Sequence, residues 1–343
     1  MRSRGRGIVI GAVAALLAGG CGGSSSNSSV ARVRTVTTTS SSTSTTSPLA
    51  SSTTATSPLA SSTTATTPLP RPKLIALLRG AHRTGVFIWT PAVAVRGQTA
   101  VWIARVAAYR EPGFTVTLLR FDQALAGLVL HAGGSQPGGS GWRHPDAVIG
   151  RERRRVMIGF NSAFQEGYGA GGFSEGGRVG WRLLRGKASV VIYRDGHADI
   201  GPWRVTVPAP GQPVDAVRQN LGLLINDGRI APSVDTCIKR CWGDPLHEQP
   251  VVARSGLGIT ARGDLLWAAG HDLSVRALAE ALRGEGAVRA MELDINPAWV
   301  AGYAYAHPRH QPPSPVPLMP GQTGIPGQFL TPYYRDFFTV DAR

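Results

Sequence analysis

The sequence predicts an α+β fold: a single globular domain of antiparallel or mixed β-sheets with a few helices packed on them. Short apolar runs rich in Val, Ile and aromatic residues recur along the chain, as at residues 100–106 and 188–193. Turn-forming dipeptides follow several runs, which is typical of hairpins. Helical segments are few and do not alternate with the strands, which excludes a parallel βαβ sheet. The glycine-rich stretch at residues 133–141 lacks the lysine and following helix of a nucleotide loop.

One helix is strongly indicated. Leu273–Arg283 carries a helical stripe of apolar residues, Ser274 suits its N-cap, and the glycines after it suit its end. Weaker periodicity predicts two further helices, over Gln123–Leu130 and His144–Arg153. Two hairpins are expected, turning at Asp195-Gly196 and at Arg262-Gly263.

The strand predicted after this helix carries an acidic pair. Ala290–Ile295 alternates apolar and acidic residues, so Glu292 and Asp294 are expected on one face, about 7 Å apart along the strand. Asn296-Pro297 ends the strand at once. Two carboxylates at a strand tip are candidates for catalysis, and the alternative is a solvated strand face followed by a turn.

The chain begins with the pattern of an export signal. Residues 1–21 combine arginines, a short apolar core and the small residues Ala18-Gly19-Gly20 directly before Cys21. This resembles a bacterial lipobox and predicts cleavage before Cys21 and lipidation of its thiol. Residues 22–72 are mainly Ser, Thr, Ala and Pro with a ten-residue repeat, which predicts a disordered stalk. Residues 73–343 are expected to form the folded domain.

The net charge indicates the kind of partner, and the cysteine positions indicate a disulfide. Lys and Arg exceed Asp and Glu by 36 − 21 = 15, so the domain attracts polyanions, unless arginine serves solubility alone. Export and the lack of a nucleic-acid motif favour an anionic envelope polymer or a phosphate-bearing substrate over nucleic acid. Cys237 and Cys241 are close enough to form a disulfide in an oxidising compartment. A zinc site would need two more ligands, and only His247 is near.

Further polar residues stand at strand ends or beside glycines. Asn161-Ser162 ends an apolar run, and Asn220 precedes another. These amides suit sugar hydroxyls, or they hold turns. Arg254 enters a glycine-spaced strand, where it suits two-point binding of an anion or lies at the surface. His131 opens the glycine loop, where it binds substrate or is structural.

Five motifs in order carry a resemblance to a known family. They are N-S-A-F (161–164), A-S-V-V-I-Y-R-D-G (188–196), Q-N-L-G-L-L-I-N-D-G (219–228), R-S-G-L-G-I-T-A-R-G-D-L (254–265) and L-A-E-A-L-R-G-E-G-A-V-R-A-M-E-L-D (278–294). Residues 150–300 thereby resemble the phosphodiester glycosidases, which include the enzyme that removes N-acetylglucosamine from phosphodiesters on lysosomal enzymes. The closing R-D-F-F run, Arg335–Phe338, resembles a bacterial lipoprotein branch of this family.

The resemblance implies hydrolysis of a sugar-1-phosphodiester in the cell envelope without a metal or other cofactor. Asp294 activates water or attacks the anomeric carbon, Glu292 orients it, and Arg254 stabilises the leaving phosphate. Asn161 and Asn220 are implied to hold sugar hydroxyls, and the other predicted substrate-binding residues are Ser162, Asn296 and His131. A divalent cation on Glu292, Asp294 and Asn296 is the weaker alternative.

Two departures from the family pattern leave a second function open. I-N-P-A-W (295–299) replaces the family's glycine run, and N-S-A-F replaces N-G-G-F-F. Loss of the glycines favours a non-catalytic module that binds cell-wall glycan or serves as an envelope scaffold. Retention of Arg254 and the acidic pair favours the enzyme.

Overall fold

The computed structural model describes residues 71–74, 88–245, 249–325 and 327–343. All of these described residues belong to one compact unit. The predicted signal peptide, Cys21 and nearly all of the predicted stalk lie outside the described residues.

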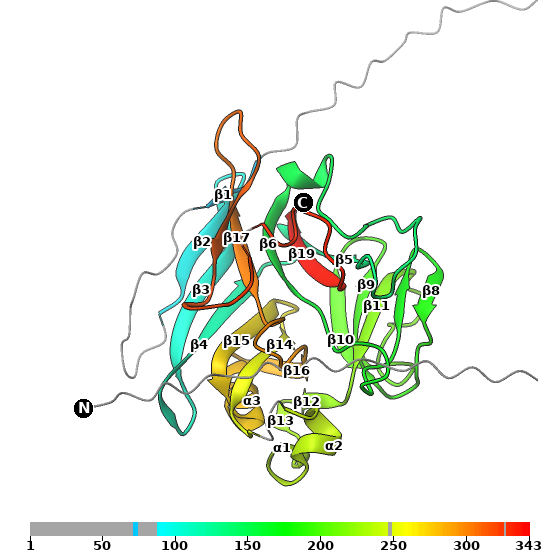
Figure 1. The fold of residues 1–343 in the computed structure, drawn as a ribbon, viewed down its shortest axis with the longest axis vertical. Coiled ribbons are helices and arrows are strands. Elements are labelled where there is room, and N and C mark those ends of the chain that lie inside the picture. Colours follow the sequence, from blue (N-terminus) through cyan, green and yellow to red (C-terminus); the bar gives the residue numbers. More distant parts are fainter. Residues whose placement is uncertain (1–70, 75–87, 246–248, 326) are drawn as a thin grey trace, which may run out of the picture. The chain divides into compact units, whose positions relative to one another are not determined.

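Three antiparallel sheets make up the described unit (Figure 1). The first contains, in spatial order, β1 (Lys73–Leu74), β2 (Thr90–Val95), β3 (Gln98–Ala108), β4 (Glu111–Phe121), β15 (Leu265–Leu273), β14 (Val252–Thr260), β16 (Ala287–Glu292), β12 (Leu223–Asn226) and β13 (Arg229–Ile230). The second contains β10 (Ala198–Pro202), β9 (Ala188–Tyr193), β11 (Val214–Asn220), β7 (Phe173–Glu175) and β8 (Arg178–Trp181). The third contains β18 (Ser314–Pro317), β17 (Gly302–Ala306), β6 (Val156–Asn161), β19 (Phe337–Ala342) and β5 (Ala126–His131).

The predicted α+β class is wrong, because the fold is predominantly β. The helices in the described ranges are α1 (Ser233–Thr236), α2 (Ile238–Trp242), α3 (Val275–Gly284) and the 3₁₀ turn η1 (Glu152–Arg154). The helix predicted over Gln123–Leu130 is absent, since Ala126–His131 is strand β5 and pairs with β19. Of the helix predicted over His144–Arg153, only the short turn η1 forms at its end.

The strongest local predictions are confirmed. Helix α3 begins after Ser274, whose hydroxyl accepts a hydrogen bond from the backbone N–H of Ala277. Strands β9 and β10 form a hairpin around Gly196, and β14 and β15 form one around Gly263. Both glycines have positive φ, which these turns require.

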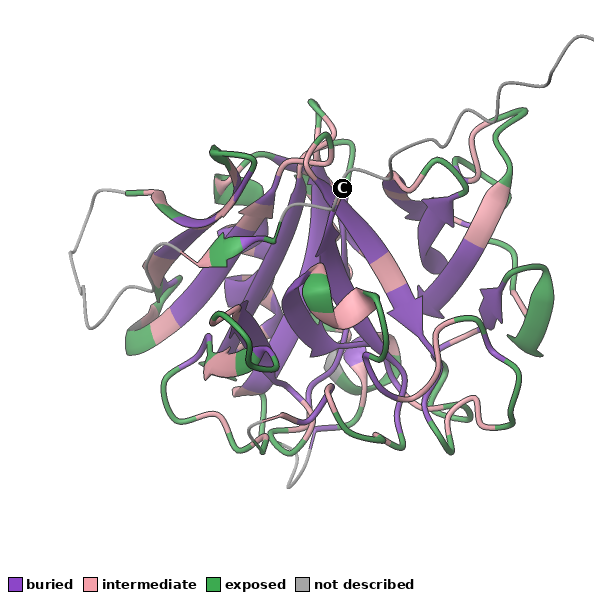
Figure 2. Ribbon diagram, turned by 90° about the horizontal axis from the view of Figure 1, so that it is seen from above, coloured by how far each residue is buried: buried purple, intermediate pink, exposed green. Residues whose placement is uncertain are grey.

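Strand β15 shows how the layers are built. Leu265, Trp267 and Ala269 face the core between the sheets, whereas Leu266 and Ala268 face the core beneath α3. This alternation follows from the period of two along a strand. Figure 1 shows α3 against β14, β15 and β16, and Figure 2 shows the strands buried along most of their length. The apolar area removed from water between these layers is the main stabilising contribution to the fold.

The chain's last strand lies inside a sheet. Strand β19 pairs with β5 on one side and with β6 on the other. The segment directly before it is therefore fixed relative to β6, and this segment contributes to the pocket described below. No helix among the described residues is long and apolar enough to cross a membrane.

Candidate functional site

A pocket of about 440 Å³ opens where loops from all three sheets meet. Its volume is within the range of small-molecule sites. Three segments and three single residues line it: Phe164, Gln165, Tyr168, Gly169, Lys187, Leu221, Lys239, Arg240, Gly243, Asp244, Asp294, Ile295, Asn296, Trp299 and Arg335. Of the predicted site residues, Asp294 and Asn296 are in this lining.

Asp294 is the buried carboxylate of the pocket. Strand β16 ends at Glu292, and the Asp294 side chain forms hydrogen bonds with the two residues that follow it. Its Oδ1 accepts hydrogen bonds from the backbone N–H groups of Ile295 and Asn296, at 2.8 and 2.9 Å. Its Oδ2 accepts one from Arg335 Nη2 at 2.7 Å. Burial raises the pKa of Asp294, while Arg335 and the two backbone donors oppose the rise.

Arg335 joins the pocket to the C-terminal strand. Its Nη2 also donates to the carbonyl of Ala163 at 2.9 Å, and its guanidinium lies 5.2 Å from the ring centre of Trp299. The neighbouring residue Asp336 accepts a hydrogen bond from the buried Arg218 at 2.6 Å, and Arg218 also donates to the carbonyl of Phe164 at 2.5 Å. The wall formed by Ala163 and Phe164 is thus tied to the start of β19 by two arginines.

Arg254 and Glu292 form a separate, fully buried ion pair outside the pocket lining. Arg254 Nη1 lies 2.7 Å from Glu292 Oε1, and neither side chain is exposed to solvent. Gly256 faces α3, because a Cβ there would lie 3.3 Å from Leu278. Arg254, two positions earlier in the strand, and Glu292, which pairs with Gly256, therefore also face α3. Burial raises the pKa of Glu292 to about 7, although the ion pair with Arg254 opposes this rise.

Two of the predicted asparagines, Asn161 and Asn220, hold the backbone around Asp294. Asn161 Nδ2 donates to Ser255 Oγ at 2.9 Å, and the same hydroxyl accepts from the backbone N–H of Asp294 at 3.2 Å. Asn220 Nδ2 donates to the carbonyls of Glu292 and Leu293, both at 2.9 Å. These contacts fix the backbone on which Asp294 stands.

The remaining predicted residues occupy three different environments. Ser162 is buried beside Asn161, and its hydroxyl has no hydrogen-bond partner in the described ranges. Asn296 lines the pocket and caps the backbone N–H of Ala298 at 2.9 Å. His131 lies outside the lining, in β5, where it stacks on Phe337. Burial lowers the pKa of His131 to about 3.

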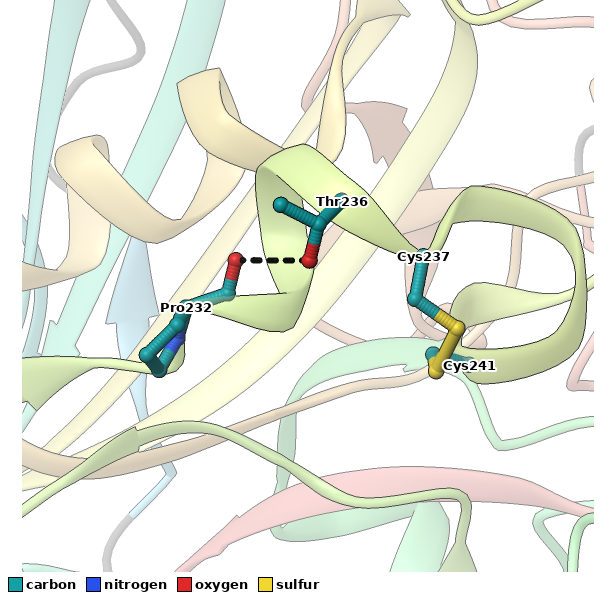
Figure 3. Close-up of a disulfide and its surroundings, with 4 residues drawn as sticks. All are labelled: Pro232, Thr236, Cys237 and Cys241. Carbon is teal, nitrogen blue, oxygen red and sulfur yellow. Dashed lines mark hydrogen bonds between the residues drawn. A yellow bond between two sulfur atoms is a disulfide. The ribbon is translucent and has the colours of Figure 1, made fainter.

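The predicted disulfide between Cys237 and Cys241 is confirmed, with its Cα atoms 5.5 Å apart (Figure 3). It closes around α2, the helix that supplies Lys239 and Arg240 to the pocket. Gly243 then packs so closely that a Cβ there would lie 2.6 Å from the ring of Phe164. The disulfide therefore stabilises one wall of the pocket.

Sequence reasoning missed most of the positive charge in the pocket. The lining holds four cations (Lys187, Lys239, Arg240, Arg335) and two acids (Asp244, Asp294), which gives 4 − 2 = +2. The Lys239-Arg240 pair inside the disulfide loop was a visible signal. Arg335 stood in the R-D-F-F run, but its pairing with Asp294 spans 41 residues. No group of three or more His, Cys, Asp or Glu side chains in the described part is arranged to hold a metal ion.

Comparisons with known proteins give only distant likenesses. No family profile and no curated protein matches the chain. Among solved structures, the chain is similar to the catalytic domain of zebrafish N-acetylglucosamine-1-phosphodiester alpha-N-acetylglucosaminidase, auto-inhibited by its pro-peptide. Identity is 13%, the TM-score is 0.45, and 80% of this chain and 88% of the other are covered.

A Burkholderia pseudomallei protein described as exported is similar at 11% identity and a TM-score of 0.35, over 67% of this chain and 74% of the other. These likenesses are too weak to assign an activity to this chain.

Proposed function

We propose that the protein hydrolyses a sugar-1-phosphodiester, with Asp294 as the catalytic carboxylate. The observation that carries the proposal is a buried aspartate opening into a pocket with a net charge of +2. A cationic pocket of this size suits a phosphate, and Phe164, Tyr168 and Trp299 offer aromatic surface for a sugar ring. The motifs that resemble phosphodiester glycosidases point the same way.

The proposed reaction is a single displacement at the anomeric carbon. Asp294 takes a proton from water, the water oxygen bonds to the anomeric carbon, and the bond from that carbon to the phosphate oxygen breaks. The leaving phosphate is a weak base and departs without a proton donor, stabilised by the cations of the pocket.

The other predicted residues support Asp294 in this proposal. Arg254 and Glu292 anchor the end of β16 from beneath, and Asn161 and Asn220 hold the backbone around Asp294 through Ser255 and the carbonyls of Glu292 and Leu293. Asn296 lines the pocket and is the predicted residue best placed to meet a sugar hydroxyl.

Replacing Asp294 tests the proposal directly. Asp294→Asn keeps the shape but removes the base, so kcat for release of sugar from UDP-N-acetylglucosamine or a wall-polymer fragment should fall about a hundredfold to ten-thousandfold. Asp244→Asn is the matched control, because it raises the pocket charge by the same one unit and should change kcat only a few-fold. If Asp294→Asn turns over as fast as the control, Asp294 is not the base.

A non-catalytic glycan-binding module is the second candidate. It is favoured by the hydrogen bonds of Asp294, because Oδ1 and Oδ2 both have protein partners. Saturable binding of a wall-polymer fragment by the wild type, with no release of sugar from any phosphodiester tested, would favour this module over the enzyme.

We propose the cell envelope as the place of action. The arginine-rich start, the apolar core and Cys21 motivate export and lipid anchoring at the outer face of the cytoplasmic membrane. A glycan or sugar-phosphate polymer of the envelope is the proposed partner, and nucleic acid is not.

A further inference from the structure

Arg335 differs from the other cations of the pocket. Its side chain is 4% exposed, whereas Lys239 and Arg240 lie on the exposed surface of α2. Lys187 is half-buried, and its Nζ donates to the carbonyl of Gly169 at 2.6 Å. A charged hydrogen bond is stronger where water is excluded, so Arg335 is the pocket cation best able to discriminate between ligands.

The two ends of the Arg335 guanidinium are used unequally. Nη2 donates to Asp294 Oδ2 at 2.7 Å and to the carbonyl of Ala163 at 2.9 Å. Nη1 is buried and has no hydrogen-bond partner among the described residues. An unpaired buried donor on a cation is unfavourable unless a ligand satisfies it. The guanidinium carbon lies over the Trp299 ring, 5.2 Å from its centre, which is within the range of a cation–π interaction.

We propose that Arg335 is the phosphate-binding and specificity-determining residue of the site: Nη1 binds a non-bridging phosphate oxygen of the substrate while Nη2 holds Asp294. This rests on the proposed function and names the residue that would select sugar phosphates over ordinary glycosides. Since one rigid guanidinium contacts both groups, the phosphate is held beside the carboxylate. The anomeric carbon, one bridging oxygen from the phosphorus, then lies within reach of a water on Asp294.

A sugar without phosphate leaves Nη1 unsatisfied. Loss of a charged hydrogen bond at a buried site corresponds to about a ten- to hundredfold loss of affinity. The wild type is therefore expected to bind N-acetylglucosamine 1-phosphate at least tenfold more tightly than N-acetylglucosamine, with inorganic phosphate competing.

The first test is calorimetric binding by Arg335→Lys. A lysine keeps the charge but cannot hold Asp294 and phosphate in a planar fork. Affinity for N-acetylglucosamine 1-phosphate should fall about ten- to hundredfold, while that for N-acetylglucosamine should change less than twofold. Arg178→Lys is the control, because Arg178 also lies over a tryptophan, Trp142, but outside the pocket lining. Folded Arg335→Lys protein that binds the sugar phosphate within twofold of wild type would overturn the assignment.

The second test separates this assignment from the reaction itself. Arg335→Lys should lower kcat/KM for UDP-N-acetylglucosamine about ten- to hundredfold more than kcat/KM for a nitrophenyl glycoside of the same sugar. Equal losses on both substrates would refute phosphate selection and leave the hydrolase intact. Arg335-dependent binding without any turnover would sustain the phosphate site and reject hydrolysis.

Discussion

Arg254 and Glu292 are paired where no solvent reaches them. Removing one partner of such a pair leaves an uncompensated buried charge, so Arg254→Met should lower the free energy of unfolding by about 3–5 kcal/mol at pH 8. The double variant Arg254→Met, Glu292→Leu removes both charges and should recover most of that loss. Chemical denaturation of the three proteins gives these values.

The same pair predicts a pH dependence. Burial raises the pKa of Glu292 to about 7 even with Arg254 present, and loss of Arg254 raises it further. A raised carboxyl pKa makes folding favour the protonated form, so stability is lost as the pH rises through the folded pKa. The deficit of Arg254→Met should therefore be smaller at pH 5 than at pH 8. An equal deficit at both pH values would contradict this reading of the pair.

At the residue scale, alternation along the strand predicted part of the site. It placed Glu292 and Asp294 on one face, but the strand ends at Glu292 and the following chain turns. Glu292 thus faces α3 with Arg254, and Asp294 faces the pocket with Arg335. The pairing of Asp294 with Arg335 could not be predicted, because no local pattern relates residues so far apart in sequence.

The pairing of strand β19 with β5 was not predicted from the sequence. Most of β5 was predicted as helix, because the short apolar segment Gln123–Leu130 is compatible with both helical and strand periodicity. The segment forms a strand because it pairs with β19, which lies more than 200 residues later in the chain. By contrast, the cap of α3 and the turns at Gly196 and Gly263 depend on neighbouring residues alone, and they were predicted correctly.

Asp341 gives β19 a measurable pH response. It is buried, and burial and the nearby Glu152 raise its pKa to about 7 from 3.8, although Arg155 and Thr339 oppose the rise. Folding therefore favours protonated Asp341, and this contribution is lost as the pH rises from about 4 through about 7. Asp341→Asn should exceed the wild type in Tm at pH 8, with a smaller difference at pH 5.

The comparison within one pair of proteins isolates Asp341. Glu152 and His144 titrate near it in both proteins, so the difference in Tm between variant and wild type is the quantity to follow. A wild type that loses no more Tm than Asp341→Asn between pH 5 and pH 8 would show that Asp341 does not ionise in this range.

At the scale of the whole molecule, the pocket exists only after the three sheets have assembled. Phe164 follows β6 of the third sheet, Leu221 follows β11 of the second, and Asp294 follows β16 of the first. The sequence motifs marked several of these strand ends separately. Their convergence depends on sheet order and packing, which local patterns do not encode.

The proposed place at the cell envelope rests on two independent interactions of the whole chain. One is the proposed lipid on Cys21, and the other is the proposed attraction of a formal charge of +15 to anionic lipids and polymers. High salt screens the second but does not remove a lipid. Fractionation in low and high salt therefore separates them.

We expect wild-type protein to stay in the membrane fraction after a wash with about 1 M salt, at which the Debye length is about 3 Å. Cys21→Ser should be retained at low salt by charge alone and released by the same wash, because the attraction between its basic surface and the envelope is then screened. Wild type that is released by salt would show that charge, and not a lipid, holds the protein. A Cys21→Ser variant that resists the wash would point to another anchor, since neither the thiol nor the surface charge would then account for retention.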